Sequence, residues 1–235
     1  MRRFNQLVSL ACLVVLLCPS AHARNPQDQG SQSEWWPEID TYVKLNERAS
    51  LMFEVSRTTD GINYSSADIG PTLQFTLKPI LRRKLEVNNP EKRKYLTFAV
   101  GYRYIPTLDK PDENRVQLEL TPRYAFPGSL LLSNRNRVDI RDIGGMWSWR
   151  FRERLTLERS FKIKKASLAP YAQGELFYDS RYDIWNRNVY EFGFTLGVRR
   201  WLDLKPYYAH QNDSRSSIPH VNAAGLTASF YFRNK

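Results

Sequence analysis

The chain has little cysteine, little histidine and no long apolar run in its main part. Its two cysteines, Cys12 and Cys18, lie close to the N-terminus, so a chain cleaved after Ala23 contains none. That absence excludes disulfides, cysteine metal ligands and cysteine nucleophiles from the rest of the chain. Beyond the N-terminus, no apolar stretch approaches the ~20 residues of a membrane-spanning helix, which excludes a helical membrane protein.

Aromatic residues, by contrast, are abundant. The 13 Tyr, 12 Phe and 6 Trp in 235 residues exclude a disordered chain, which cannot build a core. Lys and Arg number 35 against 24 Asp and Glu, a formal net charge of +11, and the mean hydropathy is −0.54. A basic balance is also typical of nucleic-acid binding. An export signal and inward-facing cations, described next, argue against a nucleic-acid partner.

Residues 1–23 have the pattern of a cleavable secretory signal peptide. Arg2 and Arg3 form a charged start, residues 7–18 are apolar, and Ala21-His22-Ala23 supplies a small-x-small cleavage site. A short membrane anchor is the alternative. Cleavage leaves 33 Lys and Arg against 24 Asp and Glu, a net charge of +9.

After the signal peptide, two regions differ in pattern. Residues 24–34 are polar and rich in Gln and Ser, which predicts a flexible N-terminal tail. Residues 35–235 show alternation with period two; in residues 96–104, for example, Leu, Phe, Val and Tyr alternate with Thr, Ala, Gly and Arg. Successive side chains of a strand point to opposite faces, so each segment has one apolar face and one polar face.

Turn signals such as Asp60-Gly61, Pro127-Gly128 and Gly144-Gly145 separate the alternating segments. The expected strands cover residues 38–45, 48–57, 67–78, 94–105, 114–125, 130–142, 146–159, 167–178, 187–201, 203–212 and 221–232. These are about eleven segments. Bacterial single-chain barrels have even strand numbers, so we interpret eleven as a miscount of ten or twelve.

Alternation alone also fits a soluble sandwich or a lipocalin. Many segments are much longer than the five or six residues, roughly, of an average soluble strand and match a tilted membrane crossing. Aromatic residues near segment ends fit interfacial girdles: Trp35, Trp36, Trp147, Trp185, Trp201, Tyr124 and Tyr178. The predicted fold is therefore all-β, a transmembrane antiparallel up-and-down β-barrel of 10–12 strands over residues 35–235. A soluble periplasmic β-protein is the alternative.

The polar face carries twelve cations and six anions when counted in phase along the segments. Its most distinctive feature is a basic cluster on two neighbouring segments: Arg135, Arg137, Arg141, Arg150, Arg152 and Arg154. One interpretation is a path for small anionic solutes, because guanidinium groups bind carboxylate and phosphate and a charged tube concentrates anions. The other is a ladder of ion pairs that fills the lumen, with these acidic partners: Asp139, Glu158, Glu119, Glu175 and Glu191.

A resemblance to a known family appears in the order of residues in the C-terminal half. The residues that carry it are Pro170-Tyr171, Glu175-Leu176-Phe177, Trp185, Arg187, Gly193, Gly197, Pro206-Tyr207-Tyr208, Gln211, Val221-Asn222, Gly225-Leu226 and Phe230-Tyr231-Phe232, preceded by 134–137 and 150–158. Over roughly residues 35–232, the chain resembles a family of bacterial outer-membrane β-barrels known only as a domain of unknown function. The resemblance implies outer-membrane lipid and the outer-membrane assembly machinery as partners. It brings no activity and no catalytic residues.

A catalytic alternative is an outer-membrane lipid hydrolase, which needs a Ser–His pair. After residue 23 the chain has only His210 and His220, and residues 213–219 have the composition of an exposed loop. Two histidines and scattered acids supply no metal ligand set, and no phosphate-binding glycine motif is present. We therefore expect no catalytic residues, no metal and no cofactor.

These observations lead to one main hypothesis and two alternatives. The main hypothesis is an outer-membrane β-barrel, exported by a cleavable signal peptide, that forms a narrow passive channel favouring anionic solutes. The first alternative is a non-conducting structural or scaffold barrel. The second is a lipid-modifying outer-membrane enzyme.

Overall fold

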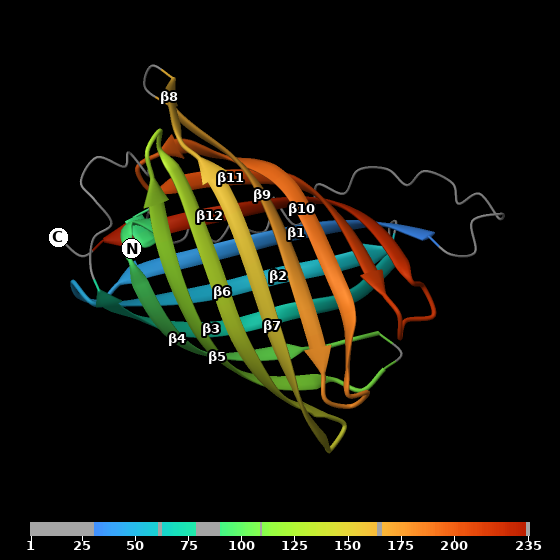
Figure 1. The fold of residues 1–235 in the computed structure, drawn as a ribbon. Helices are drawn as coiled ribbons and strands as arrows, with labels where there is room; N and C mark the ends of the chain where they lie inside the picture. The colour runs from blue at the N-terminus through green and yellow to red at the C-terminus, as the bar shows by residue number, and fades with distance from the viewer. Residues whose placement is uncertain (1–30, 61–62, 79–89, 109, 164–165, 234–235) are drawn as a thin grey trace, which may run out of the picture.

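The described chain forms a closed β-barrel in a computed structural model (Figure 1). The structure describes residues 31–60, 63–78, 90–108, 110–163 and 166–233. The predicted signal peptide, residues 1–23, and the tail up to residue 30 lie outside the described residues. Residues 31–34 belong to the first strand, so the predicted end of the tail at residue 34 was wrong. These four residues are ordered as a strand because they pair with residues 220–223 of the last strand.

The described residues form twelve strands and one short 3₁₀ helix. In chain order they are β1 (Ser31–Lys44), β2 (Ala49–Asp60), β3 (Asn63–Lys78), η1 (Pro90–Arg93), β4 (Leu96–Ile105), β5 (Glu113–Phe126), β6 (Leu130–Ile143), β7 (Met146–Arg159), β8 (Phe161–Ile163), β9 (Ala166–Asp179), β10 (Ile184–Arg199), β11 (Leu202–Asp213) and β12 (His220–Arg233). Each of the eleven predicted segments overlaps one long strand, although β1 begins seven residues before its predicted start at residue 38. The expected all-β class is confirmed.

Eleven of these strands form the barrel wall, and β8 pairs only with the start of β9. Consecutive wall strands pair antiparallel, whereas β1 and β12 pair in parallel along 14 positions. The expectation of an even strand number and a purely antiparallel barrel was therefore wrong. When an odd number of strands alternates in direction, the first and last point the same way, so closure requires one parallel seam. The result is a closed, mixed barrel.

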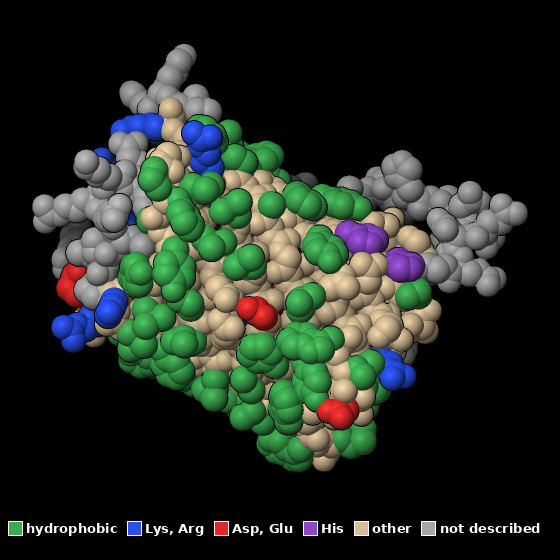
Figure 2. All heavy atoms as spheres, in the orientation of Figure 1, with side chains coloured by type: hydrophobic (Ala, Val, Ile, Leu, Met, Phe, Trp, Pro, Cys, Tyr) green, Lys and Arg blue, Asp and Glu red, His purple; other side chains and the backbone are tan. Residues whose placement is uncertain are grey.

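The two faces of each strand differ as the alternation predicts. On β4, Val100, Tyr102 and Tyr104 are 37–44% exposed, whereas Ala99 and Arg103 are 4% and 1% exposed. Large exposed hydrophobic side chains come from nine of the eleven wall strands, and Figure 2 shows them spread over the visible outer surface. Polar and charged side chains therefore occupy the interior.

Most of the predicted girdle aromatics lie on the outer surface near strand ends, including Trp147, Trp185, Trp201 and Tyr124. Trp36 is an exception, because it lines the interior and donates a hydrogen bond to Glu34 at 2.5 Å. In the part of the chain that the structure describes, no helix is both long enough and apolar enough to span a membrane.

Candidate functional site

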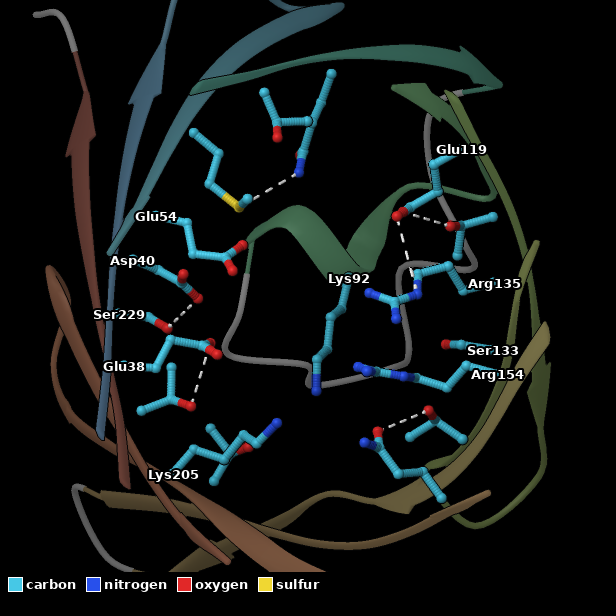
Figure 3. A pocket seen from close by; sticks show the side chains of 18 of the residues that line it. Glu38, Asp40, Glu54, Lys92, Glu119, Ser133, Arg135, Arg154, Lys205 and Ser229 are labelled. Atoms are coloured by element: carbon cyan, nitrogen blue, oxygen red, sulfur yellow. Dashed lines mark hydrogen bonds and ion pairs between the residues drawn. The ribbon is translucent and has the colours of Figure 1, made fainter. Parts of the chain in front are cut away.

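The barrel interior holds two adjoining cavities of about 390 Å³ and 510 Å³. They share part of their lining, including Glu38, Arg154 and Lys205. Figure 3 shows the smaller cavity, with side chains of opposite charge on facing sides of the wall. The interior is the candidate functional site because it gathers charged side chains from most of the strands.

All six arginines of the predicted basic cluster face this interior, and we call them the arginine wall. They come from β6 and β7, whose register places Arg135 opposite Arg154 and Arg137 opposite Arg152. Like charges directly opposite each other on neighbouring strands repel. Carboxylates on the flanking strands β5 and β9 relieve this repulsion.

Glu175 on β9 is the central carboxylate of the arginine wall. Its side chain is 3% exposed. Oε1 accepts hydrogen bonds from Arg135 Nη2 at 2.8 Å and Arg152 Nε at 2.9 Å. Oε2 accepts from Arg154 Nη2 at 2.6 Å and Nε at 3.0 Å. One buried carboxylate thus holds three guanidinium groups, and charge-assisted hydrogen bonds of this kind are among the strong ones.

Two more of the predicted acidic partners also contact the arginine wall. Asp139 is fully buried and lies 3.2 Å from Arg150 Nη2 and 3.7 Å from Arg152 Nη1. Glu119 accepts hydrogen bonds from Arg137 Nη2 at 2.9 Å and Nε at 3.1 Å. These contacts match the ion-pair ladder, because the carboxylates alternate with the guanidinium groups.

The remaining partners differ from those predicted. Arg141 forms a bidentate pair with Glu113, at 2.7 and 2.8 Å, and a hydrogen bond to Asp179 at 3.1 Å. Neither acid was predicted as a partner, because both lie at strand ends. Glu158 and Glu191 face inward as expected, but their ion pairs are with Lys92 and with Lys205. Those two lysines lie on η1 and β11, outside the arginine wall.

The charge balance of the interior also differs from the twelve cations and six anions counted on the polar faces of the predicted strands. Among described residues, the two cavities are lined by thirteen Lys and Arg and ten Asp and Glu. The expected excess of six cations is reduced to three because several uncounted acids line the cavities: Glu38, Asp40, Asp68, Glu113 and Asp203. Three of the twelve cations counted along the segments are Arg48, Lys78 and Arg199, and these are exposed and do not line the cavities.

Four carboxylates lie across from the arginine wall, and we call them the acidic arc: Glu38, Asp40, Glu54 and Asp203. The register brings them together. Asp203 is beside Ser229, Ser229 is beside Asp40, and Asp40 is beside Glu54, in one row across β11, β12, β1 and β2. In Figure 3, Glu38, Asp40 and Glu54 line one side of the cavity, while Arg135 and Arg154 line the other. The row crosses the seam that closes the barrel.

The acidic arc has fewer partners than the arginine wall. Glu54 accepts a hydrogen bond from Arg103 at 2.8 Å. Glu38 accepts one from Thr227 at 3.3 Å, and Asp40 Oδ2 accepts one from Ser229 and one from Tyr42, both at 3.4 Å. Asp40 Oδ1 and Asp203 Oδ2 are buried and have no hydrogen-bond partner within the described part of the chain.

The count along the segments placed Glu54 on the polar face but missed the other three members of the acidic arc, although part of their signal was present. Glu38 and Asp40 alternate with Ile39, which marks them as inward-facing once β1 is known to be a strand. The proximity of Asp203 was not visible in the sequence, since it depends on how the barrel closes. The alternation along a strand shows which face each acidic side chain occupies, whereas the closure of the barrel decides which other side chains lie next to it.

The two histidines lie on the outer surface, on β11 and at the start of β12. His210 contacts Asn222 at 2.9 Å and Asn212 at 3.0 Å, and His220 contacts Asn212 at 2.7 Å. Their rings stack with centroids 6.2 Å apart. Within the described ranges, no group of three or more His, Cys, Asp or Glu side chains is arranged to hold a metal ion.

The family of the chain is known from a comparison of sequences. Residues 33–222 match a family described as "Protein of unknown function (DUF2490)". No curated protein matches the chain. The family match confirms the expected resemblance to a domain of unknown function, and it assigns no role.

Proposed function

The chain belongs to the DUF2490 family, and we propose that it is an outer-membrane β-barrel whose polar interior is a narrow passive path for small hydrophilic solutes. The observation that supports this proposal is the inverted distribution of side chains. Leu118 and Leu120 on β5 are 38% and 43% exposed, whereas the polar side chain of Gln117, on the opposite face of the same strand, is 3% exposed. A barrel that folds in water normally has the opposite arrangement.

A lipid environment accounts for both faces of the wall. Outward apolar side chains contact acyl chains, and the closed strand pairing satisfies the backbone hydrogen bonds that lipid cannot satisfy. The wall strands have 10 to 16 residues, enough for a tilted crossing of roughly 9–11 residues plus an interfacial turn at each end. The expected location in the bacterial outer membrane is therefore part of this proposal.

Flotation with lipid vesicles tests the location. Residues 24–235 are refolded from urea in the presence of phosphatidylcholine vesicles and centrifuged through a sucrose gradient. We expect the protein to float with the lipid, to need detergent when lipid is absent, and to show heat-modifiable mobility on gels. A compact monomer that stays in buffer and does not float would overturn the proposal.

The ion selectivity of the path depends on whether the guanidinium groups of the arginine wall can bind solute anions or are held in ion pairs with carboxylates of the barrel. All six arginines have a carboxylate within 4.0 Å, and this pairing supports the ion-pair ladder rather than an anion path. Planar-bilayer recording of the triple variant Arg150→Glu, Arg152→Glu and Arg154→Glu separates the two. An anion path predicts a reversal potential of opposite sign. A ladder predicts that the variant does not fold.

A non-conducting scaffold barrel is the second candidate. It is supported by the ion-pair density and by η1, from which Lys92 reaches toward the cavity in Figure 3 and pairs with Glu158 on β7. Folded protein that inserts into bilayers but gives no conductance steps would favour this candidate over the path.

We infer a role other than lipid hydrolysis, because the hydrogen bonds described for His210 and His220 are with asparagine side chains and not with serine. Phospholipid cleavage by the purified protein that disappears in His210→Ala or His220→Ala would overturn this inference.

A further inference from the structure

The acidic arc contains two buried carboxylate oxygens, Asp40 Oδ1 and Asp203 Oδ2, that accept no hydrogen bond from the described residues. We propose that it is a binding site for a small organic cation with an ammonium group, such as an aliphatic amine or diamine, in the 390 Å³ cavity. The proposal depends on the barrel interior alone and holds whether or not the barrel conducts.

The first support is the crowding of like charges. Asp40 lies directly opposite Glu54 on the neighbouring strand, and Glu38 lies two positions away on the same face of β1. Like charges placed opposite each other in a sheet are destabilising. Among the described residues, Glu54 is the one member of the acidic arc that forms an ion pair; its partner is Arg103, which also pairs with Asp68. A bound cation would relieve the repulsion between the other carboxylates.

The second support is the state of the buried oxygen atoms. Asp40 and Asp203 are 7% and 6% exposed, and both line the cavity. Asp40 Oδ1 and Asp203 Oδ2 have no hydrogen-bond partner among the described residues. Leaving a buried acceptor unsatisfied costs about 1–3 kcal/mol, and more when the group is charged. An ammonium group supplies three N–H donors, which suit such acceptors.

The third support is that the two lysines and the four arginines of the arginine wall that line this cavity already have carboxylate partners. Lys205 pairs with Glu191 at 3.1 Å, and Lys92 pairs with Glu158. The arginine wall is held by Glu119, Asp139, Glu175 and other acids, as described above. The carboxylates that remain without ion pairs in the described lining of this cavity are Glu38, Asp40 and Asp203, and all three belong to the acidic arc.

The fourth support concerns the kind of cation. Lys205 shows how this interior holds an ammonium group: its Nζ lies 3.1 Å from Glu191 and 5.0 and 5.2 Å from the ring centroids of Tyr171 and Tyr207. Carboxylates together with aromatic faces suit organic cations. Hydroxyl groups of Thr227 and Ser229 lie beside Glu38 and Asp40 and can accept further N–H bonds. A volume of about 390 Å³ corresponds to a dozen or so waters of roughly 30 Å³, enough for a short diamine.

Calorimetric titration of the detergent-folded protein, residues 24–235, tests the proposal with 1,4-diaminobutane as the probe. We expect saturable binding to the wild type. The double variant Glu38→Gln and Asp40→Asn should lose at least tenfold in affinity while it keeps the heat-modifiable mobility of the folded barrel. Glu47→Gln, in the exposed turn after β1, is the matched control and should bind like the wild type. If the double variant does not fold, Asp203→Asn alone should weaken binding.

Several results would overturn the proposal. One is the absence of saturable heat with the folded wild type. Another is undiminished affinity in the folded double variant. Equal competition by 1-butanol, which has the chain but no charge, or by calcium or potassium ions would show that the cavity does not select ammonium groups. None of these results depends on conductance. A negative result in flotation or bilayer recording would therefore count against the proposed function but not against the cation site.

Discussion

Asp40 Oδ2 on the first strand accepts a hydrogen bond from Ser229 Oγ on the last strand at 3.4 Å, although 189 residues separate the two in sequence. The contact exists because β1 and β12 pair in parallel. That seam closes the barrel, and it places carboxylates from both ends of the chain in one row.

The parallel seam predicts a specific disulfide. Ile39 and Ala228 are register partners across β1 and β12. In the chain from residue 24 onward, which lacks native cysteine, we expect Ile39→Cys with Ala228→Cys to cross-link on oxidation, because partners on paired strands lie within disulfide reach. Non-reducing gels of the unfolded protein should show a faster band that disappears with a thiol.

The control for the seam moves one cysteine along the last strand. Ala224 pairs with Trp35, four positions from Ile39. At about 3.3 Å per residue the offset is roughly 13 Å, beyond the ~7 Å limit for a disulfide. Ile39→Cys with Ala224→Cys should not cross-link, and equal cross-linking of both pairs would contradict the parallel register.

Removing Glu175 should destabilise the barrel strongly. Glu175→Gln leaves Arg135, Arg152 and Arg154 without their shared carboxylate. Breaking a buried ion pair by removing one partner costs about 3–5 kcal/mol. Urea unfolding in vesicles, followed by tryptophan fluorescence, should show a midpoint well below that of the wild type.

A second substitution tests whether Glu175→Gln destabilises the barrel through uncompensated charge or through lost packing. Arg154→Gln added to Glu175→Gln removes one of the uncompensated cations and should recover part of the lost stability, since residues in one ion-pair network are not additive. A double variant less stable than Glu175→Gln alone would argue against an electrostatic role for the pair.

The loss of stability caused by an arginine on the outer face should show whether that face contacts lipid or water. Leu118 lies near the middle of β5 and is 38% exposed, whereas Phe126 lies at the end of the strand and is 46% exposed. In a bilayer, Leu118→Arg should cost about 2–4 kcal/mol and Phe126→Arg about 0–1 kcal/mol, because the penalty depends on depth. Unfolding titrations in vesicles measure both. In a water-soluble barrel neither substitution should destabilise.

The contact of Gly70 on β3 with the backbone of β4 predicts that this glycine is sensitive to substitution. A Cβ atom at Gly70 of β3 would lie 2.0 Å from the carbonyl oxygen of Tyr102 on β4, so Gly70→Ala must displace one strand. Overpacking of this kind costs about 1–3 kcal/mol. At Gly174, a Cβ atom would be 3.7 Å from the ring of Tyr190, an ordinary contact, and Gly174→Ala should be tolerated. Thermal unfolding in detergent compares the two variants.

Much of the wall was predictable because alternation is a local property. The expected segment 146–159 coincides with β7, and the six arginines of the basic cluster face the interior as predicted. The partners Asp139, Glu119 and Glu175 were also predictable, since they lie in phase on neighbouring strands. Glu113 and Asp179 were not, because they stand at strand ends where the alternation gives no clear boundary.

Apart from the first half of β1 and the short β8, the sequence by itself determined where the strands run and which of their faces is apolar, because the two-residue period of a strand is a property of neighbouring residues. The tertiary structure alone decided the odd number of wall strands, the parallel seam and the meeting of Glu38 and Asp40 with Asp203. These features depend on the pairing of the first strand with the last strand. No local pattern encodes that pairing, since it is fixed only when the whole sheet closes on itself.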